Sequence, residues 1–512
     1  MNDAPPAAPE PLDLPADDLP PRPAPPPPVE APKPAGPHPS PARALANLSV
    51  LLVCGFLLFR VGIAEPFGVP TGSMAPTLIG NHHQTACPRC GYPVRVGMPT
   101  GGERAGHYAD IPCPNCGQKT NLNTAPAVNG DRVMVDKLIY QFRRPRRWEV
   151  AVFRCAADQY KAYVKRILGL PGEEITIVDG EVYANAELLR KALAEVRETQ
   201  IPVFDLAFVP PGGWGSRWYV YPPDRDARLP PGDAPPPAPA DGIVLQNNRL
   251  VLDAAASPQA EVRLEYRHVD LDGRDPAGEP VRSATGYDGG NRSTSNVYPV
   301  HDFSVRCELD VVEAKPGATL ALRLFDGADA VAAEVSVGPR AAGRASLSHD
   351  KQGGLAAARG VGLEPGHTYT VEFAFVDRRV SFAVDRRVVV PPVDLPAEKK
   401  RGEVRRPLQL GARGCRVVVT RLQLFRDIHY TQAGRHGTRV PARLGADEYF
   451  MLGDNSGNSQ DSREWPTPGV PAGDFLGKPI LVHQPLRPGR LTVLGRERVF
   501  QTLDWGRLRW LH

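Results

Sequence analysis

The sequence predicts a mostly β protein that follows a single apolar helix and is interrupted by two insertions. Short strand-like runs separated by glycine turns recur past residue 66, for example GDRVMVDKLIY and TYTVEFAFVDRRVSFAVDRRVVV. An apolar stretch covers residues 44–64. A compact group of cysteines and a long β-rich segment break the pattern at two places, and we interpret both as insertions.

Bulk properties limit the classes of function. A chain of 512 residues is long enough for two or more domains, because single cores rarely grow past roughly 250–300 residues. The formal charge of +4 is small, and no long Lys/Arg block is present, so we expect no nucleic-acid partner. Eight cysteines are too few for a disulfide scaffold of this size.

The N-terminal part predicts a tail followed by a membrane anchor. Residues 1–43 are rich in proline, and we expect a disordered tail there. Residues 44–64 have about the 20 residues that a bilayer span needs, with Arg60 near one end. The alternative is a cleaved signal peptide, since the strictly apolar run 50–59 is short. A retained transmembrane helix is favoured, because the polar tail is long and no convincing cleavage site follows.

The rest of the chain divides into four segments. Residues 66–186 form the first part of a β-domain, in which 81–124 is the first insertion. Residues 187–300 read as an irregular β-rich cap, aromatic and rich in Pro and Gly after a helical pattern at 187–200. Residues 301–430 have regularly spaced strands that predict a β-sandwich, and 431–512 return to the β-domain and form the C-terminal segment.

Two separated residues carry the candidate chemistry. Ser73 stands in the stiff turn VPTGSMAPTL, close to the expected membrane anchor. Lys165 stands in the strand-like run YVKRILGLPG, where Tyr163 and Ile167 share its face. A lysine packed among apolar groups loses solvation of its charged form, so its pKa falls and it can activate a serine. No G-x-S-x-G elbow is present, and a Ser-His-Asp site is the weaker hypothesis.

Four segments together resemble bacterial type I signal peptidases, the membrane-bound Ser–Lys endopeptidases that remove signal peptides. They are PTGSMAPTL, GDRVMVDKLIYQFRRPRRWEVAVFR, YVKRILGLPGEEI and GDNSGNSQDSREW, in that order after the apolar stretch. Each is a weak pattern alone, and their order makes a chance match improbable. The resemblance leaves about half of the chain unmatched.

The resemblance implies a set of roles for individual residues. Ser73 is expected to be the nucleophile and Lys165 the general base, while the oxyanion is held by the backbone N–H of Ser73 and the hydroxyl of Thr71. Ser459 is expected to hydrogen-bond the lysine. Supporting roles fall to Asp461 and Arg463, as an ion pair, and to Tyr163.

The sequence departs from the family pattern at two places. Ser456 stands where the family commonly has an arginine after GDN. Arg147, Trp148 and Glu149 stand where it usually has Arg-Gly-Asp. Both departures affect supporting positions, so the expected serine and lysine are unchanged.

The first insertion resembles a zinc ribbon. Cys87 and Cys90, and Cys113 and Cys116, form two C-P-x-C-G knuckles, and four thiolates on two tight turns suit tetrahedral zinc. Two disulfides are the alternative, particularly outside the inner membrane. We favour structural zinc, and expect no cofactor for catalysis.

The second insertion contains a segment that looks like a laminin-G or concanavalin-type sandwich. Such sandwiches often bind glycans or proteins, and many are scaffolds. Cys307 and Cys415 lie near its two ends, and either a disulfide or two buried free thiols fits the sequence.

The function predicted from these features is a signal peptidase I: a single-pass endopeptidase of the inner (cytoplasmic) membrane with its catalytic domain on the non-cytoplasmic side. Its expected partners are the lipid bilayer and the signal peptides of exported preproteins. One alternative is a membrane-anchored glycan- or protein-binding module on an inactive peptidase scaffold. Another is a Ser–Lys protease with one dedicated substrate.

Overall fold

The structure is a computed structural model of the chain. It describes residues 40–99, 108–159, 161–211, 213, 217–221, 243–246, 248–256, 261–268, 278–284, 286–289, 297–398, 400–493 and 496–511. The proline-rich tail predicted over 1–43 lies outside the described residues up to position 39. The chain divides into two units, Met1–Leu58 and Phe59–His512.

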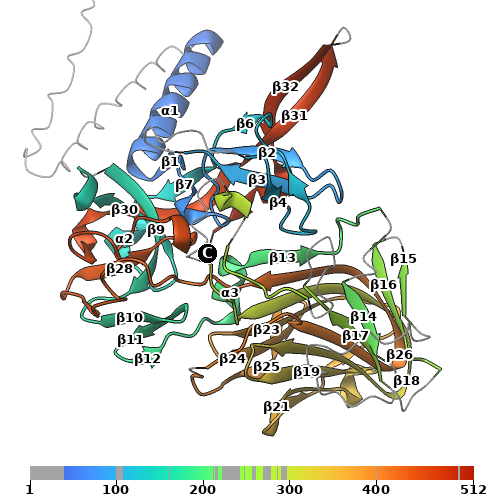
Figure 1. Cartoon of the computed structure of the whole chain (residues 1–512). Helices are drawn as coiled ribbons and strands as arrows, with labels where there is room; N and C mark the ends of the chain where they lie inside the picture. Colours follow the sequence, from blue (N-terminus) through green and yellow to red (C-terminus); the bar gives the residue numbers. More distant parts are fainter. Residues whose placement is uncertain are drawn as a thin grey trace, which may run out of the picture. The chain divides into compact units, whose positions relative to one another are not determined.

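The N-terminal helix α1 spans Pro41–Gly62, so it begins in the first unit and its last residues belong to the second (Figure 1). The helix therefore begins inside the last residues of the predicted tail. Several of its apolar side chains are exposed, among them those of Leu51 and Phe56. Among the residues that the structure describes, no helix combines the length and apolar character needed to cross a membrane.

The second unit is mostly β, as the sequence predicts. Its first sheet is built from strands of both chain ends, and the short helix α2 (Ile139–Phe142) follows one of them. In spatial order the strands are β1 (Ala64–Gly68), β7 (Arg132–Asp136), β30 (Phe475–Gln484), β8 (Val150–Cys155), β9 (Lys161–Gly169), β28 (Glu448–Leu452) and β29 (Gly469–Pro471), with β33 (Arg509–Trp510) paired to β30. Segments far apart in sequence are thus joined by backbone hydrogen bonds.

A smaller sheet marks where the long second insertion, residues 187–430, leaves the β-domain and returns to it. Its order is β12 (Glu187–Leu188), β11 (Glu181–Ala184), β10 (Glu174–Val178) and β27 (Ala442–Arg443). β10 pairs with β27 across the whole insertion, which is therefore closed at its base. The helical pattern at 187–200 corresponds to β12 and to the helix α3 (Leu193–Thr199).

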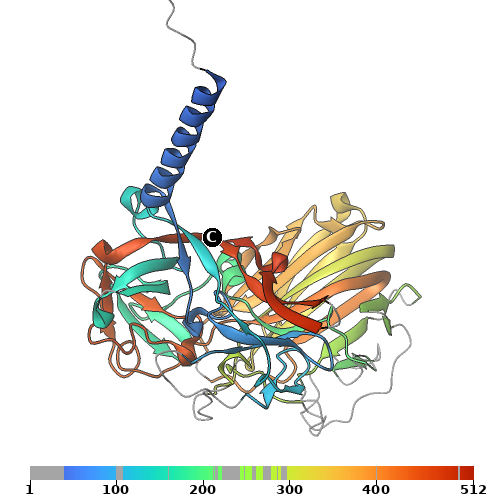
Figure 2. The same cartoon turned by 90° about the horizontal axis from the view of Figure 1, so that it is seen from above.

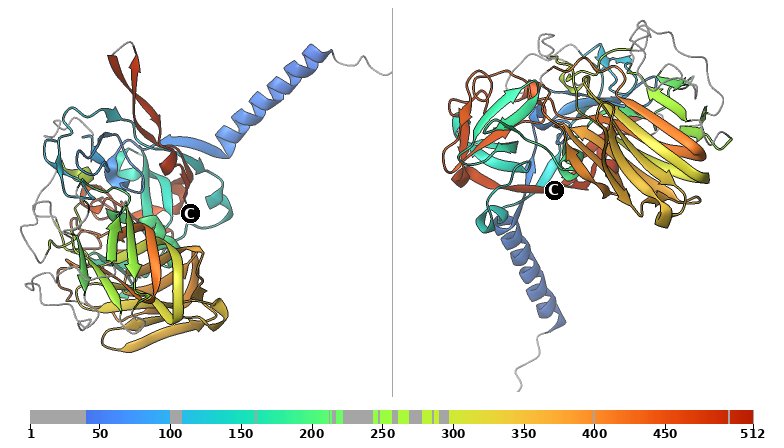
Figure 3. Two further views of the ribbon diagram at one scale, coloured as in Figure 1. Left: turned by 90° about the vertical axis from the view of Figure 1, so that its right-hand side faces the viewer. Right: turned by 90° about the horizontal axis from the view of Figure 1, so that it is seen from below.

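Three small sheets complete the part outside the long insertion. The cysteine-containing segment carries β3 (Pro93–Gly97), β2 (His82–Ala86) and β6 (Ala127–Val128), and a separate pair, β4 (Ile111–Pro112) and β5 (Lys119–Thr120). Near the C-terminus, β31 (Leu486–Val493) and β32 (Arg496–Leu503) form an antiparallel hairpin, drawn in red in Figure 3.

The long insertion forms one large hydrogen-bonded sheet. Its strands are β13 (Ile201–Asp205), β14 (Trp218–Tyr221), β15 (Ile243–Gln246), β16 (Arg249–Asp253), β17 (Val262–Tyr266), β18 (Phe303–Phe325), β19 (Ala330–Val337), β20 (Arg344–His349), β21 (Gly353–Arg359), β22 (Gly362–Leu363), β23 (Thr368–Val376), β24 (Arg379–Val384), β25 (Arg387–Asp394) and β26 (Leu408–Arg426). The prediction of a separate irregular cap at 187–300 is wrong for its strands, because β13, β16 and β17 all pair with β26.

Two long strands, β18 and β26, run side by side through this sheet (Figure 2). The pairing shifts register between Glu308 and Leu309, between Val311 and Glu313, and between Ala314 and Thr319. Such irregularities let a strand bend, so β18 pairs with β23 through its first part and with β19 through its last. β21 also lies against β25, so the sheet folds back on itself.

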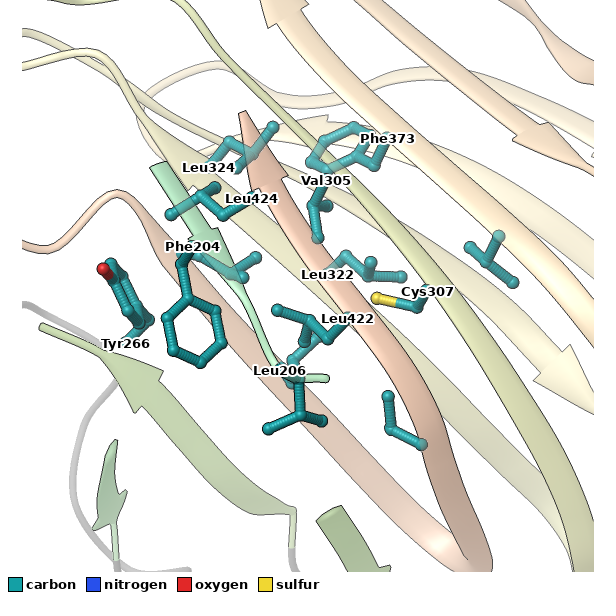
Figure 4. Close-up of a cluster of buried hydrophobic side chains, with 14 of the residues drawn as sticks. Phe204, Leu206, Tyr266, Val305, Cys307, Leu322, Leu324, Phe373, Leu422 and Leu424 are labelled. Carbon is teal, nitrogen blue, oxygen red and sulfur yellow. The ribbon is translucent and has the colours of Figure 1, made fainter. Parts of the chain in front are cut away.

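The interior of the folded sheet is apolar (Figure 4). Phe204 of β13 and Tyr266 of β17 pack with residues of β18, β23 and β26, which fixes the segment before residue 300 to the predicted sandwich. Cys307 and Cys415 are both buried free thiols, so the disulfide alternative for this pair is not realised. Burial raises the pKa of the Cys307 thiol to about 12.

Candidate active site

Ser73 is held in a short 3₁₀ turn, η1, that spans Gly72–Met74. The turn is fixed from below because Met74 and Leu78 are fully buried against the first sheet. Asp131 accepts a hydrogen bond from the backbone N–H of Ile79 at 2.8 Å, which fixes the residues that follow the turn. The serine is 8% exposed, and the contacts of its turn hold the hydroxyl in place at the edge of the core.

Lys165 reaches the serine from β9. Its side chain is 2% exposed, and its Nζ lies 2.6 Å from Oγ of Ser73. Burial lowers the pKa of Lys165 to about 8; the Asp461 carboxylate opposes this shift and the Arg463 guanidinium adds to it. A buried amine whose pKa is close to neutral can accept a proton from a hydroxyl in contact with it.

Thr71 and Tyr163 border this pair. Oγ1 of Thr71 lies 3.4 Å from Oγ of Ser73, and the threonine is exposed. The ring centroid of Tyr163 is 5.6 Å from Nζ of Lys165, and its hydroxyl donates to Asp158 at 3.2 Å. Both predicted residues therefore lie beside the serine and the lysine.

The polar segment 453–465 lies behind the lysine, and most of its residues are buried; Gly457, Asn458, Gln460 and Glu464 are exposed. The guanidinium of Arg463 binds both carboxylate oxygens of Asp461, Nε and Nη2 each at 2.8 Å. The prediction that Ser459 hydrogen-bonds Lys165 is wrong. Within the described part of the chain, the Ser459 hydroxyl donates to Asp461 at 2.8 Å and makes no hydrogen bond to Lys165. The carboxylate beside it is a stronger acceptor than the lysine amine.

Ser456 fills the position where the related family commonly has an arginine. Its hydroxyl accepts hydrogen bonds from Nη1 of Arg463 and from the backbone N–H of Thr431, both at 2.8 Å. Arg463 also donates to the carbonyl of Thr431. The small side chain thus anchors Arg463 from the far side of its ion pair with Asp461.

Sequence reasoning missed an ion pair and an amide near the site. Arg166, which follows the lysine on β9, donates to both carboxylate oxygens of Asp454, at 2.8 Å and 2.6 Å. The backbone N–H of Asn455 donates to the carbonyl of Ser73 at 3.0 Å, and its side chain donates to the carbonyl of Gly72 at 3.1 Å. Asp454 and Asn455 belong to the GDN segment that begins the fourth motif, and this position was the sequence feature that could have indicated a role near the site.

Trp148 shows why the second departure from the family pattern is tolerated. Its φ is 72°, a left-handed conformation that favours the glycine of the usual Arg-Gly-Asp pattern. The Trp148 ring lies 4.4 Å from Nζ of Lys191, which in turn binds Asp377 and Asp427 of the long insertion. The tryptophan therefore gains a contact with the insertion that glycine cannot make.

The four cysteines of the first insertion come together. The Sγ atoms of Cys87 and Cys116 are 3.6 Å apart, those of Cys90 and Cys113 are 3.7 Å apart, and none is in a disulfide. A tetrahedron with metal–sulfur bonds of about 2.3 Å has edges of about 3.8 Å, so the spacing fits zinc. In each knuckle a glycine with positive φ, Gly91 or Gly117, donates its N–H back to the first cysteine's carbonyl.

Comparison with known proteins gives sequence matches in two segments, which include the two ends of the long insertion. The family model described as signal peptidase, peptidase S26, matches residues 119–211 and 397–483. Signal peptidase I of Rickettsia massiliae is 29% identical over 142 residues, which cover 28% of this chain and 42% of that protein. Probable signal peptidase I-2 of Synechocystis is 39% identical over 64 residues, 12% of this chain and 29% of that protein.

Solved structures match at low similarity. The exoplasmic/lumenal domain of VIP36, in a Ca²⁺/Man3GlcNAc-bound form, is 11% identical, with 43% of this chain and 87% of that chain covered and a TM-score of 0.27. The carbohydrate-binding module CBM66 of Bacillus subtilis is 14% identical, with 24% and 75% covered and a TM-score of 0.19.

The sequence matches assign the matched segments to the peptidases. Within that class, the chain is related to the bacterial type I signal peptidases, and the resemblance predicted from the four motifs is confirmed. The chain spans less than half the length of the two relatives named above. Lys165 and the polar segment lie inside the matched residues, whereas Thr71 and Ser73 precede them.

Proposed function

We propose that this protein is a serine endopeptidase that removes signal peptides from exported preproteins through a Ser–Lys dyad. The observation that carries the proposal is the 2.6 Å distance between Nζ of the buried Lys165 and Oγ of Ser73. The relationship to signal peptidases supplies the substrate class. We further propose that Thr71 is an oxyanion donor.

The proposed reaction is acyl transfer. Neutral Lys165 accepts the hydroxyl proton of Ser73 while Oγ attacks the carbonyl carbon of the scissile peptide bond. The backbone N–H of Ser73 and the hydroxyl of Thr71 donate to the oxyanion. Collapse of this intermediate breaks the C–N bond, and the protonated lysine returns the proton to the leaving amine. Water, deprotonated by Lys165, then attacks the acyl-enzyme and releases Ser73.

The edge of β9 supports a peptide substrate. β9 pairs with β8 through residues 161–166, but with β28 only through Arg166, Ile167 and Gly169. Ala162–Lys165 therefore have a strand partner on one side alone among the described residues. An extended peptide added to this edge would form main-chain hydrogen bonds beside Ser73.

We also propose that the apolar run 44–64 anchors the protein in the inner membrane, with the site on the non-cytoplasmic side. The exposed apolar side chains of α1 support this, since such a surface is costly in water. Membrane fractions washed with carbonate test the proposal: the chain is expected in the pellet, and recovery in the wash would contradict it.

We propose a structural zinc ion for Cys87, Cys90, Cys113 and Cys116. Bound there, the ion would hold the two cysteine turns together and so add stability to this segment. No catalytic step is assigned to it.

Cleavage of a preprotein by the detergent-solubilised full chain tests the proposed function. The wild type is expected to release the mature product, and Ser73→Ala and Lys165→Ala are each expected to lose it. Ser348→Ala and Lys351→Ala, both in the long insertion, are matched controls expected to cleave normally. Cleavage by Ser73→Ala would overturn the dyad, and no cleavage by any form would favour a binding protein on an inactive scaffold.

A further inference from the structure

A short turn of the long insertion contacts the segment that carries Ser73. This turn, η3, spans Gly286–Asp288. It lies outside the residues that the signal peptidase family model matches. The family relationship therefore assigns no role to it.

Tyr287 packs directly on the serine turn. It is 9% exposed and forms an apolar cluster with Ala75 and Ile79. A Cβ added to Gly72 would collide with Cε1 of Tyr287, and one added to Gly97 of β3 would lie 2.6 Å from the same atom. The tyrosine thus fills the space between the residue before Ser73 and the cysteine-containing segment.

Asp288 reaches the serine turn through Asn455. A primary amide has two N–H groups, and Nδ2 of Asn455 donates to Oδ1 of Asp288 at 2.6 Å and to the carbonyl of Gly72 at 3.1 Å. Nδ2 of Asn458 donates to the same carboxylate oxygen at 3.3 Å. Rotating the Asn455 amide would bring its oxygen against two acceptors, so the carboxylate and the carbonyl together fix its orientation.

Asn455 is therefore a bridge between the insertion and the candidate nucleophile. Its backbone N–H binds the carbonyl of Ser73, while its side chain binds Gly72 on one side and Asp288 on the other. The carboxylate is half-buried, and a hydrogen bond to a charged acceptor is stronger than one between neutral groups.

We propose that Asp288 is a positioning residue for Ser73, acting through the side-chain amide of Asn455, so that the insertion completes the active site. The proposal rests on the proposed role of Ser73 as nucleophile. Without the carboxylate, the amide is free to turn away from Gly72. The serine turn then loses a restraint on the distance between Oγ and Nζ of Lys165, and small misplacements of a nucleophile slow the chemical step.

The test compares kcat and KM for preprotein cleavage by the full chain in detergent. Asp288→Ala is expected to lower kcat about tenfold, the effect of one lost hydrogen bond, with KM within about twofold. Asp288→Asn keeps an acceptor oxygen and is expected to stay within about threefold of the wild type. Asp253→Ala, a substitution of an aspartate in β16, is the matched control and is expected to leave kcat unchanged.

A double variant separates positioning from a general effect on folding. If Asp288 acts through the amide, Asp288→Ala adds no further loss of kcat in an Asn455→Ala background. Additive losses would overturn the proposal, as would equal losses in Asp288→Ala and Asp288→Asn. Should Asp288→Ala fail to fold, Asp288→Ser, which is too short to reach the amide, replaces it in both comparisons.

Ser73→Ala distinguishes the two proposals. If Ser73→Ala still cleaves the preprotein, the proposed function is wrong, and this inference is wrong with it. Cleavage lost in Ser73→Ala, together with an unchanged kcat in folded Asp288→Ala, removes the positioning role alone.

Discussion

Arg166 and Asp454 form a two-pronged ion pair in which both side chains are at most 2% exposed. The pair joins β9, directly after Lys165, to the GDN segment, which is separated from it by the long insertion. Removing one partner leaves a buried charge without compensation. We therefore expect Asp454→Ala to lower the free energy of unfolding by about 3–5 kcal/mol, measured by urea denaturation of the solubilised chain.

Two further variants test that explanation. Arg166→Met combined with Asp454→Leu removes both charges and is expected to recover most of the lost stability. Arg421→Ala breaks an exposed pair with Glu308 and is expected to cost less than about 1 kcal/mol. Similar losses in Asp454→Ala and Arg421→Ala would contradict the importance of burial.

The pH dependence of cleavage follows from the lysine. Burial places the pKa of Lys165 at about 8, below the ordinary value of 10.5, and only the neutral amine accepts the Ser73 proton. We expect kcat/KM to rise about tenfold per pH unit below pH 8 and to level off above it. A profile that is flat between pH 6 and 9 would contradict a lysine base.

The same burial makes Lys165 a cost to folding. Its pKa is lower in the folded chain than in the unfolded chain, so the unfolded chain binds more protons between about pH 8 and 10.5, and stability rises with pH in that window. Lys165→Met should therefore be inactive yet more stable by about 3 kcal/mol at pH 7. The gain should shrink as pH rises toward 10.5. A destabilised Lys165→Met at pH 7 would count against this reasoning.

The cysteine cluster predicts a bound metal. We expect about one zinc ion per chain in the purified protein, by metal analysis, and less in Cys113→Ser. Chelation is expected to lower the melting temperature, whereas a thiol reductant should leave it unchanged, since the sulfurs are separated by 3.6 Å or more. Cys54→Ser, an exposed cysteine of α1, is the matched control. Zinc content near zero would exclude the ribbon.

The mostly β class, the four motifs and the cysteine knuckles were predictable because each is a local pattern. Strand-like runs, two C-x-x-C turns and the Ser73 and Lys165 segments each lie within a few consecutive residues. The pairing of the 187–300 strands with β26 was not predictable, since it joins strands more than a hundred residues apart. The separate cap was therefore a wrong prediction. Side-chain alternation shows that a segment is a strand, but not which strand is its neighbour.

At the site, the sequence by itself determined the residue types: a serine in a stiff turn, a lysine on a strand and a polar segment near the C-terminus. Only the tertiary structure decided their partners. It directs Ser459 to Asp461 and brings Asp288 to Asn455. The physical reason is that hydrogen bonds depend on distances of about 3 Å between atoms of remote segments, and those distances are set by packing of the whole domain.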